Sequence, residues 1–407
     1  MKLLELIKLK TGIIRYMILQ LAIIFTVIYS VIQIKSLIIL IGIILILSIL
    51  MIILSFRIYK KSISIGTNHL TGKEINTEIE KRINKDKISK VGPKIVMIGG
   101  GSGLSNILKG IKKYTSNITA IVTTFDDGGS TGKLRKQLDV VAPGDIRKCI
   151  TALSNSESCM DDLLKYRFKD ENVDNHSLGN LFLVAMTDIM GSFPLAIKKI
   201  SDIFNVEGTV LPVSLDKITL CADFANGTTA EGEENIPEVG VGTTIKKLYL
   251  KQKTALPAPG VLEAIKEADI IILGPGSLYT SVICNLLVED VAEEIKEAKA
   301  KKIYIANLMT QKGETDNFEL SNHVNEIEKY LGKNILDYVV ANNEEITEET
   351  LELAGQKDSK PVTIDDEDIN NKNIKLIENN YVNTKPGMLL HNSKLIASDI
   401  IETINKI

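Results

Sequence analysis

The stretch that decides the fold is KIVMIGGGSGL, from Lys94 to Leu104. A short apolar run typical of a buried strand leads directly into consecutive glycines, and an amphipathic helical pattern follows. Glycine permits positive φ and a close approach of main chain to ligand, and the N–H groups that open the next helix point toward an anion. The stretch therefore predicts a phosphate-binding turn made by Gly100, Gly101, Ser102 and Gly103.

The glycine spacing does not fit the dinucleotide fingerprint G-x-G-x-x-G. Counted from Gly99 the last glycine would fall on Leu104, and counted from Gly101 it would fall on Asn106. NAD binding is therefore disfavoured. A tight turn that binds nothing remains the alternative, although such a turn needs only one or two glycines.

Alternation of β-branched runs with helical runs continues after Pro93 and predicts an α/β fold. The predicted strands are Lys94–Ile98, Ile118–Thr124, Asp269–Leu273, Lys302–Ala306 and Leu336–Val340. The predicted helices include Leu104–Tyr114, Leu278–Leu287 and Phe318–Leu331. We predict a Rossmann-like, doubly wound, mostly parallel sheet over residues 94–407, with ligands at the carboxyl ends of its strands. Residues 218–250 interrupt the rhythm and predict an antiparallel β insertion.

The N-terminal part of the chain is much more apolar than the rest. Residues 16–34 and 36–56 carry no formal charge, and each stretch has about the 20 residues that a helix needs to cross a bilayer. Neither stretch has a polar face, which disfavours two buried core helices. We predict a transmembrane helical hairpin over residues 1–56 and a polar tether over residues 57–93.

Basic residues on both sides of the hairpin predict its orientation. They are Lys2, Lys8, Lys10 and Arg15 before it and Arg57, Lys60 and Lys61 after it. The expected location is the cell membrane, with two spans and the main domain on the cytoplasmic side.

Charge and cysteine content exclude other classes. The net charge is −3 and no basic patch is interleaved with aromatic residues, so nucleic-acid binding is not expected. The four cysteines are scattered without C-x-x-C spacing, so neither a zinc site nor a disulfide framework is indicated.

Polar residues follow the second predicted strand, in the stretch TTFDDGGSTGK. Asp126 and Asp127, next to Thr124, could hold a divalent cation such as Mg²⁺ or orient a hydroxyl group. The alternative is a turn in which the carboxylates accept from nearby backbone amides. No cofactor is required by the pattern.

The next two polar motifs lie at the starts of predicted helices. In PGDIR, Asp145 could cap the helix that follows, while the guanidinium of Arg147 could hold an anion with two hydrogen bonds. In NHSLGN, Asn180 could contact ligand, and His176 is either a general acid–base or a structural hydrogen-bonding residue. Ser130 has no histidine near it in sequence, so no activated nucleophile is predicted.

A second glycine turn, GPGSLYTS, follows the predicted strand Asp269–Leu273 and repeats the pattern of the first. Gly276 and Ser277 are predicted to bind phosphate, and Tyr279 either stacks on a base or sugar or belongs to the core. Asn307 follows the next strand and suits a neutral heterocycle or sugar. Thr310 and Thr315 in the same segment are interpreted as turn hydroxyls, with regulatory phosphorylation as the alternative.

Several motifs together carry a family resemblance: MIGGGSGLS, TTFDDGGSTGKLR, PGDIRKC, HSLGNL, GPGSLYTS and ANLMTQKGET. In this order they resemble the family of 2-phospho-L-lactate transferase and the bacterial gluconeogenesis factor, and NLMTQKGET is more similar to the gluconeogenesis-factor branch. That branch implies a Rossmann-like protein that binds UDP-sugars such as UDP-N-acetylglucosamine and is needed for cell shape and envelope synthesis on gluconeogenic carbon sources. The expected partners are a UDP-sugar, envelope-synthesis proteins and further copies of the chain.

Two hypotheses therefore remain. In the first, the chain is a membrane-tethered regulator that binds a UDP-sugar. In the second, it resembles the transferase branch and moves a phosphoryl-linked group from a nucleoside diphosphate donor, with Asp126 and Asp127 as catalytic residues. The residues alone leave open whether any bond is made or broken.

Overall fold

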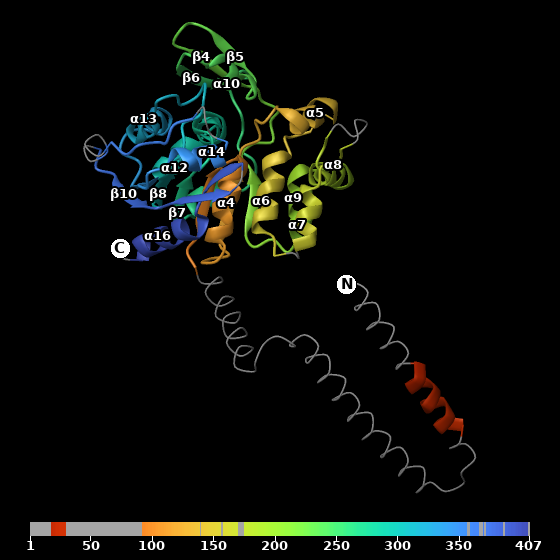
Figure 1. Ribbon diagram of the computed structural model, residues 1–407. Coiled ribbons are helices and arrows are strands. Elements are labelled where there is room, and N and C mark those ends of the chain that lie inside the picture. The colour runs from red at the N-terminus through yellow and green to blue at the C-terminus, as the bar shows by residue number, and fades with distance from the viewer. Residues whose placement is uncertain are drawn as a thin grey trace. The chain divides into compact units, whose positions relative to one another are not determined.

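The computed structural model describes residues 18–29 and, between residues 92 and 405, all except 139, 156–157, 170–174, 356–358, 366–368, 370–371 and 386. Most of the predicted transmembrane hairpin and the whole of the predicted tether up to residue 91 lie outside the described residues. The chain divides into two units, Met1–Arg82 and Ile83–Ile407. The second unit contains the α/β domain (Figure 1).

Within the described residues, no single helix has both the length and the apolar composition needed to cross a bilayer. The apolar helix Ile18–Tyr29 is shorter than a span. Helices α8 (Leu178–Met190) and α9 (Phe193–Ile203) have the length and apolar composition of a span only when taken together, and the chain bends by 118° between them. The two-span prediction stays a prediction.

A seven-stranded parallel sheet forms the centre of the domain, in the order β10-β9-β8-β7-β1-β2-β3. Its strands are β1 (Ile95–Gly99), β2 (Ile118–Val122), β3 (Thr209–Pro212), β7 (Ile270–Leu273), β8 (Lys301–Ile305), β9 (Tyr338–Asn342) and β10 (Lys375–Asn379). The predicted α/β fold with a parallel sheet is confirmed. The five predicted strands are present within about two residues, while β3 and β10 were not predicted.

Strand β1 shows why both faces of the sheet are covered. All five of its residues are buried, and alternate side chains enter two different core clusters. Val96 and Ile98 pack with α11 (Val261–Lys266), α12 (Val291–Glu297) and α13 (Leu320–Leu331). Ile95 and Met97 join the opposite cluster. That cluster includes α4 (Gly101–Ile111), α6 (Gly144–Leu153), α9 and α16 (Ser393–Asn405). A strand with two buried faces reads as a continuous apolar run.

Two small antiparallel sheets are added to this core. The first, β5-β4-β6, consists of β4 (Leu220–Phe224), β5 (Thr229–Glu231) and β6 (Ile245–Leu250), with α10 (Asn235–Val239) between β5 and β6. It is the antiparallel insertion expected over residues 218–250, and it stands at one end of the domain (Figure 1). The second sheet pairs β11 (Val382–Lys385) with β12 (Met388–His391).

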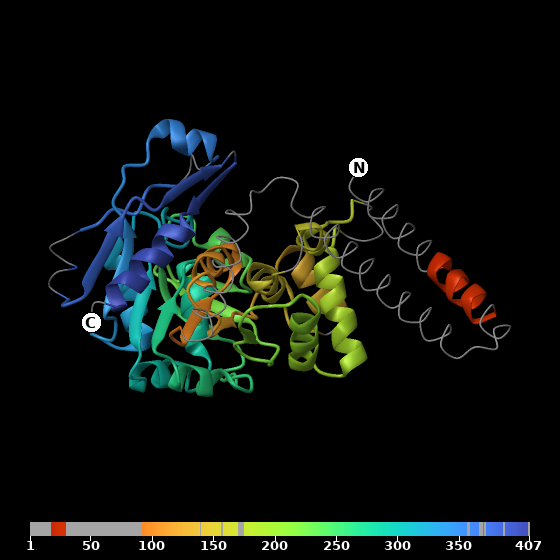
Figure 2. The same ribbon diagram turned by 90° about the horizontal axis from the view of Figure 1, so that it is seen from below.

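The remaining helices lie at the two sides of the sheet. Figure 2 shows α7 (Ser158–Lys165), α8 and α9, in yellow-green, gathered at one side of the domain, with the blue C-terminal strands at the other. Helices α5 (Gly129–Leu138) and α14 (Glu348–Leu353) are short.

The predicted helix Leu278–Leu287 is instead a π-helical turn, Leu278–Val282, followed by a 3₁₀ turn, Ile283–Leu287.

The strand order places a topological switch point between β1 and β7. From β1 the chain moves outward through β2 and β3, and it then returns to build the other half of the sheet from β7. Crevices at such switch points, beyond the carboxyl ends of the strands, are the usual ligand sites of open α/β sheets. Both glycine turns of the sequence follow these two strands.

Gly110 provides a test of the packing between α4 and α16. A Cβ atom at Gly110 would lie 2.0 Å from the carbonyl oxygen of Ser393. Alanine normally stabilises the interior of a helix by about 1 kcal/mol relative to glycine. Because of this contact, we expect Gly110→Ala to lower the free energy of unfolding by about 1–3 kcal/mol in urea denaturation. Lys109→Ala, at an exposed position on the same helix, is the control, and a stabilised Gly110→Ala would contradict the packing.

Candidate functional site

A pocket of about 410 Å³ lies at the switch point. Both glycine turns line it, and so do residues after β8, the β insertion and β12. Of the predicted site residues it brings together Gly100, Gly101, Ser102, Gly103, Gly276, Ser277 and Asn307. Elements far apart in sequence thus meet at one edge of the sheet, and we call this cavity the glycine pocket.

The first turn needs its glycines for packing and for backbone conformation. Gly101 has a φ of +66°. A Cβ atom at Gly100 would lie 2.3 Å from Cγ2 of Thr123, and one at Gly103 would lie 2.6 Å from the carbonyl oxygen of Pro275. The two glycine turns therefore touch each other, and the glycines alone do not prove that a ligand binds.

Asp145 connects the start of α4 to α6. Its Oδ2 accepts a hydrogen bond from the Gly101 amide at 2.6 Å, and its Oδ1 accepts from Nζ of Lys148 at 2.7 Å. The expectation that Asp145 caps its own helix is wrong, since its carboxylate instead serves α4, while Pro143 at the N-cap of α6 offers no side-chain cap. Within the described part of the chain, the next two amides of α4, those of Ser102 and Gly103, have no partner and remain available to an anion.

The second turn begins a π-helical segment and contacts a buried carboxyl group. The Ser277 hydroxyl accepts from the Thr280 amide at 3.1 Å and donates to Oε2 of Glu314. Burial raises the pKa of Glu314. Glu314 lies after β8 in the motif ANLMTQKGET, the same segment in which Asn307 was predicted to suit a neutral heterocycle or sugar.

Glu233 reaches the glycine pocket from the β insertion. Burial, together with the negative charge of Asp126, raises its pKa to about 8. Among the described residues, no lysine or arginine lines this pocket, whereas Glu233 and Glu314 do. Since a pKa of about 8 favours the neutral form of Glu233 near neutral pH, the pocket carries less negative charge than its composition suggests.

Amide and imidazole groups line the other wall. Nδ2 of Asn307 donates to Oε1 of Gln311 at 3.1 Å. His391, at the end of β12, has its Nε2 2.9 Å from the carbonyl oxygen of Ala306, and burial lowers its pKa to about 4. His391 is therefore neutral at physiological pH. No signal in the sequence pointed to it, because it comes from a strand that was not predicted.

Thr124 and Tyr279 do not reach the pocket. Thr124 is buried and its hydroxyl donates to the carbonyl oxygen of Ser214 at 3.2 Å. Tyr279 is fully buried in the core, beneath the second turn. Of the two alternatives open for Tyr279, its position matches the core.

Asp126 and Asp127 are engaged with backbone amides. Oδ1 of Asp126 accepts from the Gly128 amide at 3.0 Å, and Oδ1 of Asp127 accepts from the Glu234 amide of the β insertion at 3.0 Å. Burial raises the pKa of Asp126. Among the described residues no three His, Cys, Asp or Glu side chains form a group that could hold a metal ion. The two carboxylates thus shape the turn, and that of Asp127 also anchors the insertion.

Arg147 and Asn180 form a different cluster. Nε of Arg147 donates to Oδ1 of Asn180 at 2.9 Å, and both side chains are buried. Nearby, Oγ of Ser130 lies 2.8 Å from Nδ1 of His176. This pair was missed in the sequence because its members are 46 residues apart.

The threonines considered for phosphorylation are buried turn residues. The Thr310 hydroxyl accepts from the Lys360 amide at 2.9 Å, and the Thr315 hydroxyl accepts from the Gln311 amide at 2.8 Å. Their positions favour the interpretation as turn hydroxyls.

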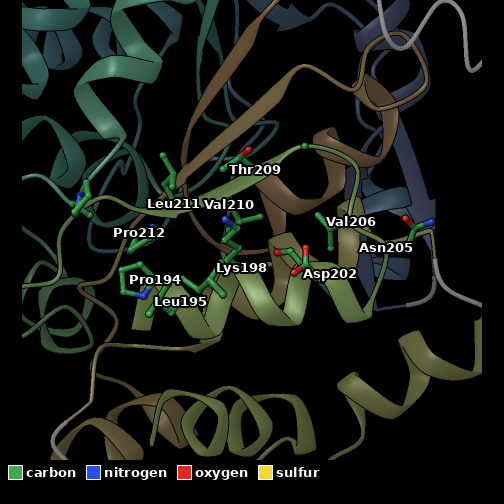
Figure 3. A pocket seen from close by; sticks show the side chains of 15 residues that line it. Pro194, Leu195, Lys198, Asp202, Asn205, Val206, Thr209, Val210, Leu211 and Pro212 are labelled. Carbon is green, nitrogen blue, oxygen red and sulfur yellow. The ribbon is translucent and has the colours of Figure 1, made fainter. Parts of the chain in front are cut away.

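A larger cavity, about 640 Å³, lies between α9 and the edge strand β3 (Figure 3). Lys198 and Asp202 of α9 and Thr209 of β3 line it, together with apolar side chains. None of the predicted site residues does. This cavity lies at the β3 edge of the sheet and not at the switch point between β1 and β7, so it is separate from the glycine pocket.

Comparisons with known proteins agree with this architecture. Residues 95–382 match the family model described as 2-phospho-L-lactate transferase CofD. A relative from Clostridium acetobutylicum is 46% identical over 337 residues, which are 81% of this chain and 75% of the relative. The gluconeogenesis factor of Bacillus subtilis is 40% identical over 315 residues, 77% of this chain and 99% of that protein. A crystal structure of a Bacillus halodurans protein, 40% identical, superposes with a TM-score of 0.73 and covers 76% of this chain and 99% of that one.

The chain therefore belongs to the 2-phospho-L-lactate transferase CofD family and is related within it to the gluconeogenesis factors. The resemblance noted from the motifs is confirmed.

The pKa of Glu233 predicts a pH dependence of the β insertion. Because the folded-state pKa of about 8 exceeds the ordinary value of 4.5, the folded state favours the protonated form. The resulting stabilisation is complete below pH 4.5 and is lost as pH rises toward and through 8. We expect amide hydrogen exchange in residues 229–239, corrected for its intrinsic pH dependence, to become less protected over this range. Glu233→Gln should abolish the effect and Glu238→Gln, at an exposed neighbouring position, should not.

Proposed function

We propose that this chain is a membrane-tethered regulator that binds a UDP-sugar and is required for cell shape and envelope synthesis on gluconeogenic carbon sources. The observation that carries the proposal is the pair of glycine turns facing the crevice between β1 and β7, with the unpartnered amides of Ser102 and Gly103 at the start of α4. Main-chain amides at a helix N-terminus are suited to a diphosphate.

The remaining lining groups suit the uncharged parts of such a ligand. Asn307 and Gln311 offer amide donors and acceptors, which can pair with a uracil edge or with sugar hydroxyls. The volume, about 410 Å³, falls within the usual range of small-molecule sites. Protonated Glu233 can donate a hydrogen bond to an oxygen atom of the ligand and does not repel the diphosphate.

The membrane part of the proposal rests on the sequence of residues 1–56, with its two uncharged stretches and basic flanks. A tether of this kind would hold the pocket next to the envelope-synthesis proteins that assemble at the membrane. A homo-oligomer is part of the same proposal.

A transferase is the second candidate. The hydrogen bond between Ser130 and His176 favours it, since a hydroxyl paired with an imidazole is the arrangement that activates nucleophiles. Among the described residues that line it, the glycine pocket has no such pair, and a nucleotide can bind there without turnover. For this reason binding is the preferred function.

Ligand binding can be tested with a bulky substitution in the glycine pocket. Ser102 is exposed, lines the pocket and lies in the first turn of α4, so Ser102→Phe should fill the phosphate position without disturbing the core. We expect calorimetric titration of the full chain with UDP-N-acetylglucosamine to show saturable binding that weakens at least tenfold in this variant. Thr229→Phe, an equivalent change at an exposed position of β5, is the control.

The same samples distinguish regulator from transferase. Incubation with UDP-N-acetylglucosamine, with and without Mg²⁺, should release neither UMP nor UDP. Turnover that disappears in Asp126→Asn/Asp127→Asn would support the transferase. Equal affinity of wild type and Ser102→Phe would contradict a ligand at the glycine turn.

The membrane tether predicts the behaviour of the full chain in cells. The protein should sediment with membranes and resist carbonate extraction, because two apolar spans are removed from lipid only by detergent. A variant lacking residues 1–56 should be released into the supernatant. A protease added outside intact cells should not reach the C-terminus, and carbonate-extractable wild-type protein would contradict the tether.

A further inference from the structure

The second cluster of polar residues lies where three helices begin. Within the first turns of these helices, Ser130 and Thr131 belong to α5, Arg147 to α6 and Asn180 to α8. A Cβ atom at Gly144 would lie 2.5 Å from Oγ1 of Thr131, so α5 and α6 begin in contact. The hydrogen bonds of Ser130 with His176 and of Arg147 with Asn180 attach both helices to the start of α8.

Arg147 is a buried cation that has no ion-pair partner among the described residues. Arg147 is only 8% exposed. Among the described residues, its guanidinium makes one hydrogen bond, from Nε to the neutral side-chain amide of Asn180. Both terminal nitrogens are left without a partner in the described part of the chain. Burial lowers the pKa of Arg147, and the positive charge of Arg167 lowers it further. Such a group is stable in a protein when an anion compensates it.

The carboxylates nearby are occupied by other contacts. Asp145, on the same helix, accepts from the Gly101 amide and from Lys148, and Asp126 accepts from the Gly128 amide. Neither forms an ion pair with Arg147 among the described residues. Asp145 therefore offsets the burial of Arg147 only in part and through its electric field, and a directly bound anion is still missing.

Further donors lie at the starts of α5 and α8, and a Cβ atom at Gly179 would lie 2.5 Å from Cδ of Arg147. The first-turn amides of Ser130, Thr131 and Gly179 have no partner among the described residues. If Ser130 donates to Nδ1 of His176, the neutral imidazole carries its proton on Nε2 and has one further donor. Ser130 is half-buried, so the cluster is accessible from solvent at this point.

We propose that Arg147, Ser130, His176 and Asn180 form a second binding site, for a small oxyanion such as a phosphate or carboxylate group, separate from the glycine pocket. The two terminal nitrogens of Arg147 bind two oxygens of the anion, which is the bidentate geometry that favours arginine for such ligands. The helix N-termini of α5 and α8 contribute their amides. The site is independent of the ligand proposed for the glycine pocket, since Arg147 does not line that pocket.

Inorganic phosphate is the probe, titrated into the full chain at constant ionic strength and followed by calorimetry and thermal unfolding. Wild type should bind phosphate saturably and unfold at a higher temperature in its presence. Arg147→Gln should weaken binding at least tenfold and lose the thermal shift, and Arg147→Lys should bind with intermediate affinity. Lys136→Gln, which removes one charge at an exposed position of α5, controls for general electrostatics and should stay within twofold of wild type.

Ser102→Phe separates this site from the glycine pocket, because it should leave phosphate affinity unchanged within twofold. Competition by UDP that disappears in Arg147→Gln would identify the anion as part of the nucleotide, whereas additive binding would identify a separate anion. Both results require the site at Arg147. The thermal shift by phosphate remains informative even if Arg147→Gln is less stable than wild type. Absence of saturable phosphate binding in wild type, or equal affinity in Arg147→Gln, would overturn the proposal.

Discussion

The hydrogen bond from the Gly101 amide to Asp145 connects the glycine pocket with the cluster of polar residues around Arg147. It joins the first turn of α4, at the glycine pocket, to α6, which carries Arg147. The carboxylate takes up the first free amide of α4, so an anion at this helix has the following two amides available. The close contact of Gly100 with Thr123 and Asp145 would not tolerate a side chain, and the geometry of the pocket thus depends on this packing.

The sequence predicted the central strands well because buried parallel strands read as uninterrupted apolar runs bounded by glycine or polar turns. β3 escaped detection because it is only four residues long, TVLP, and ends in proline. β10 escaped because this edge strand has only two apolar residues, Leu376 and Ile377, flanked by polar ones. The segment after Ser277 follows a helical pattern, yet its first turn is π-helical, since the Val282 amide donates to the carbonyl oxygen of Ser277 at 3.0 Å.

Turns that combine a strand end with a helix start are local in sequence, which explains why both glycine turns and Asn307 were identified. Glu233 and His391 belong to separate small sheets, and only the folded chain brings them to the pocket. The Ser130–His176 hydrogen bond forms because α5 approaches the start of α8 in the folded chain, and no local sequence pattern predicts this contact. Thr124 and Tyr279 were predicted as ligand-binding residues from their side-chain chemistry, but both side chains are buried and do not reach the pocket.

The distribution of charge gives the two clusters different chemistry. Among the described residues that line it, the glycine pocket has two glutamates and no cationic side chain, so a diphosphate there would depend on main-chain amides and on the neutral carboxyl group of Glu233. The cluster at Arg147 has the reverse character, a buried guanidinium beside helix N-termini with its nearest carboxylates already engaged. Asp145 lies between them and interacts with both, because its carboxylate binds α4 while its electric field partly offsets the cost of burying Arg147. Occupancy of one cluster by an anion would therefore change the electrostatic potential at the other, which provides a physical route for coupling two ligands through a single side chain.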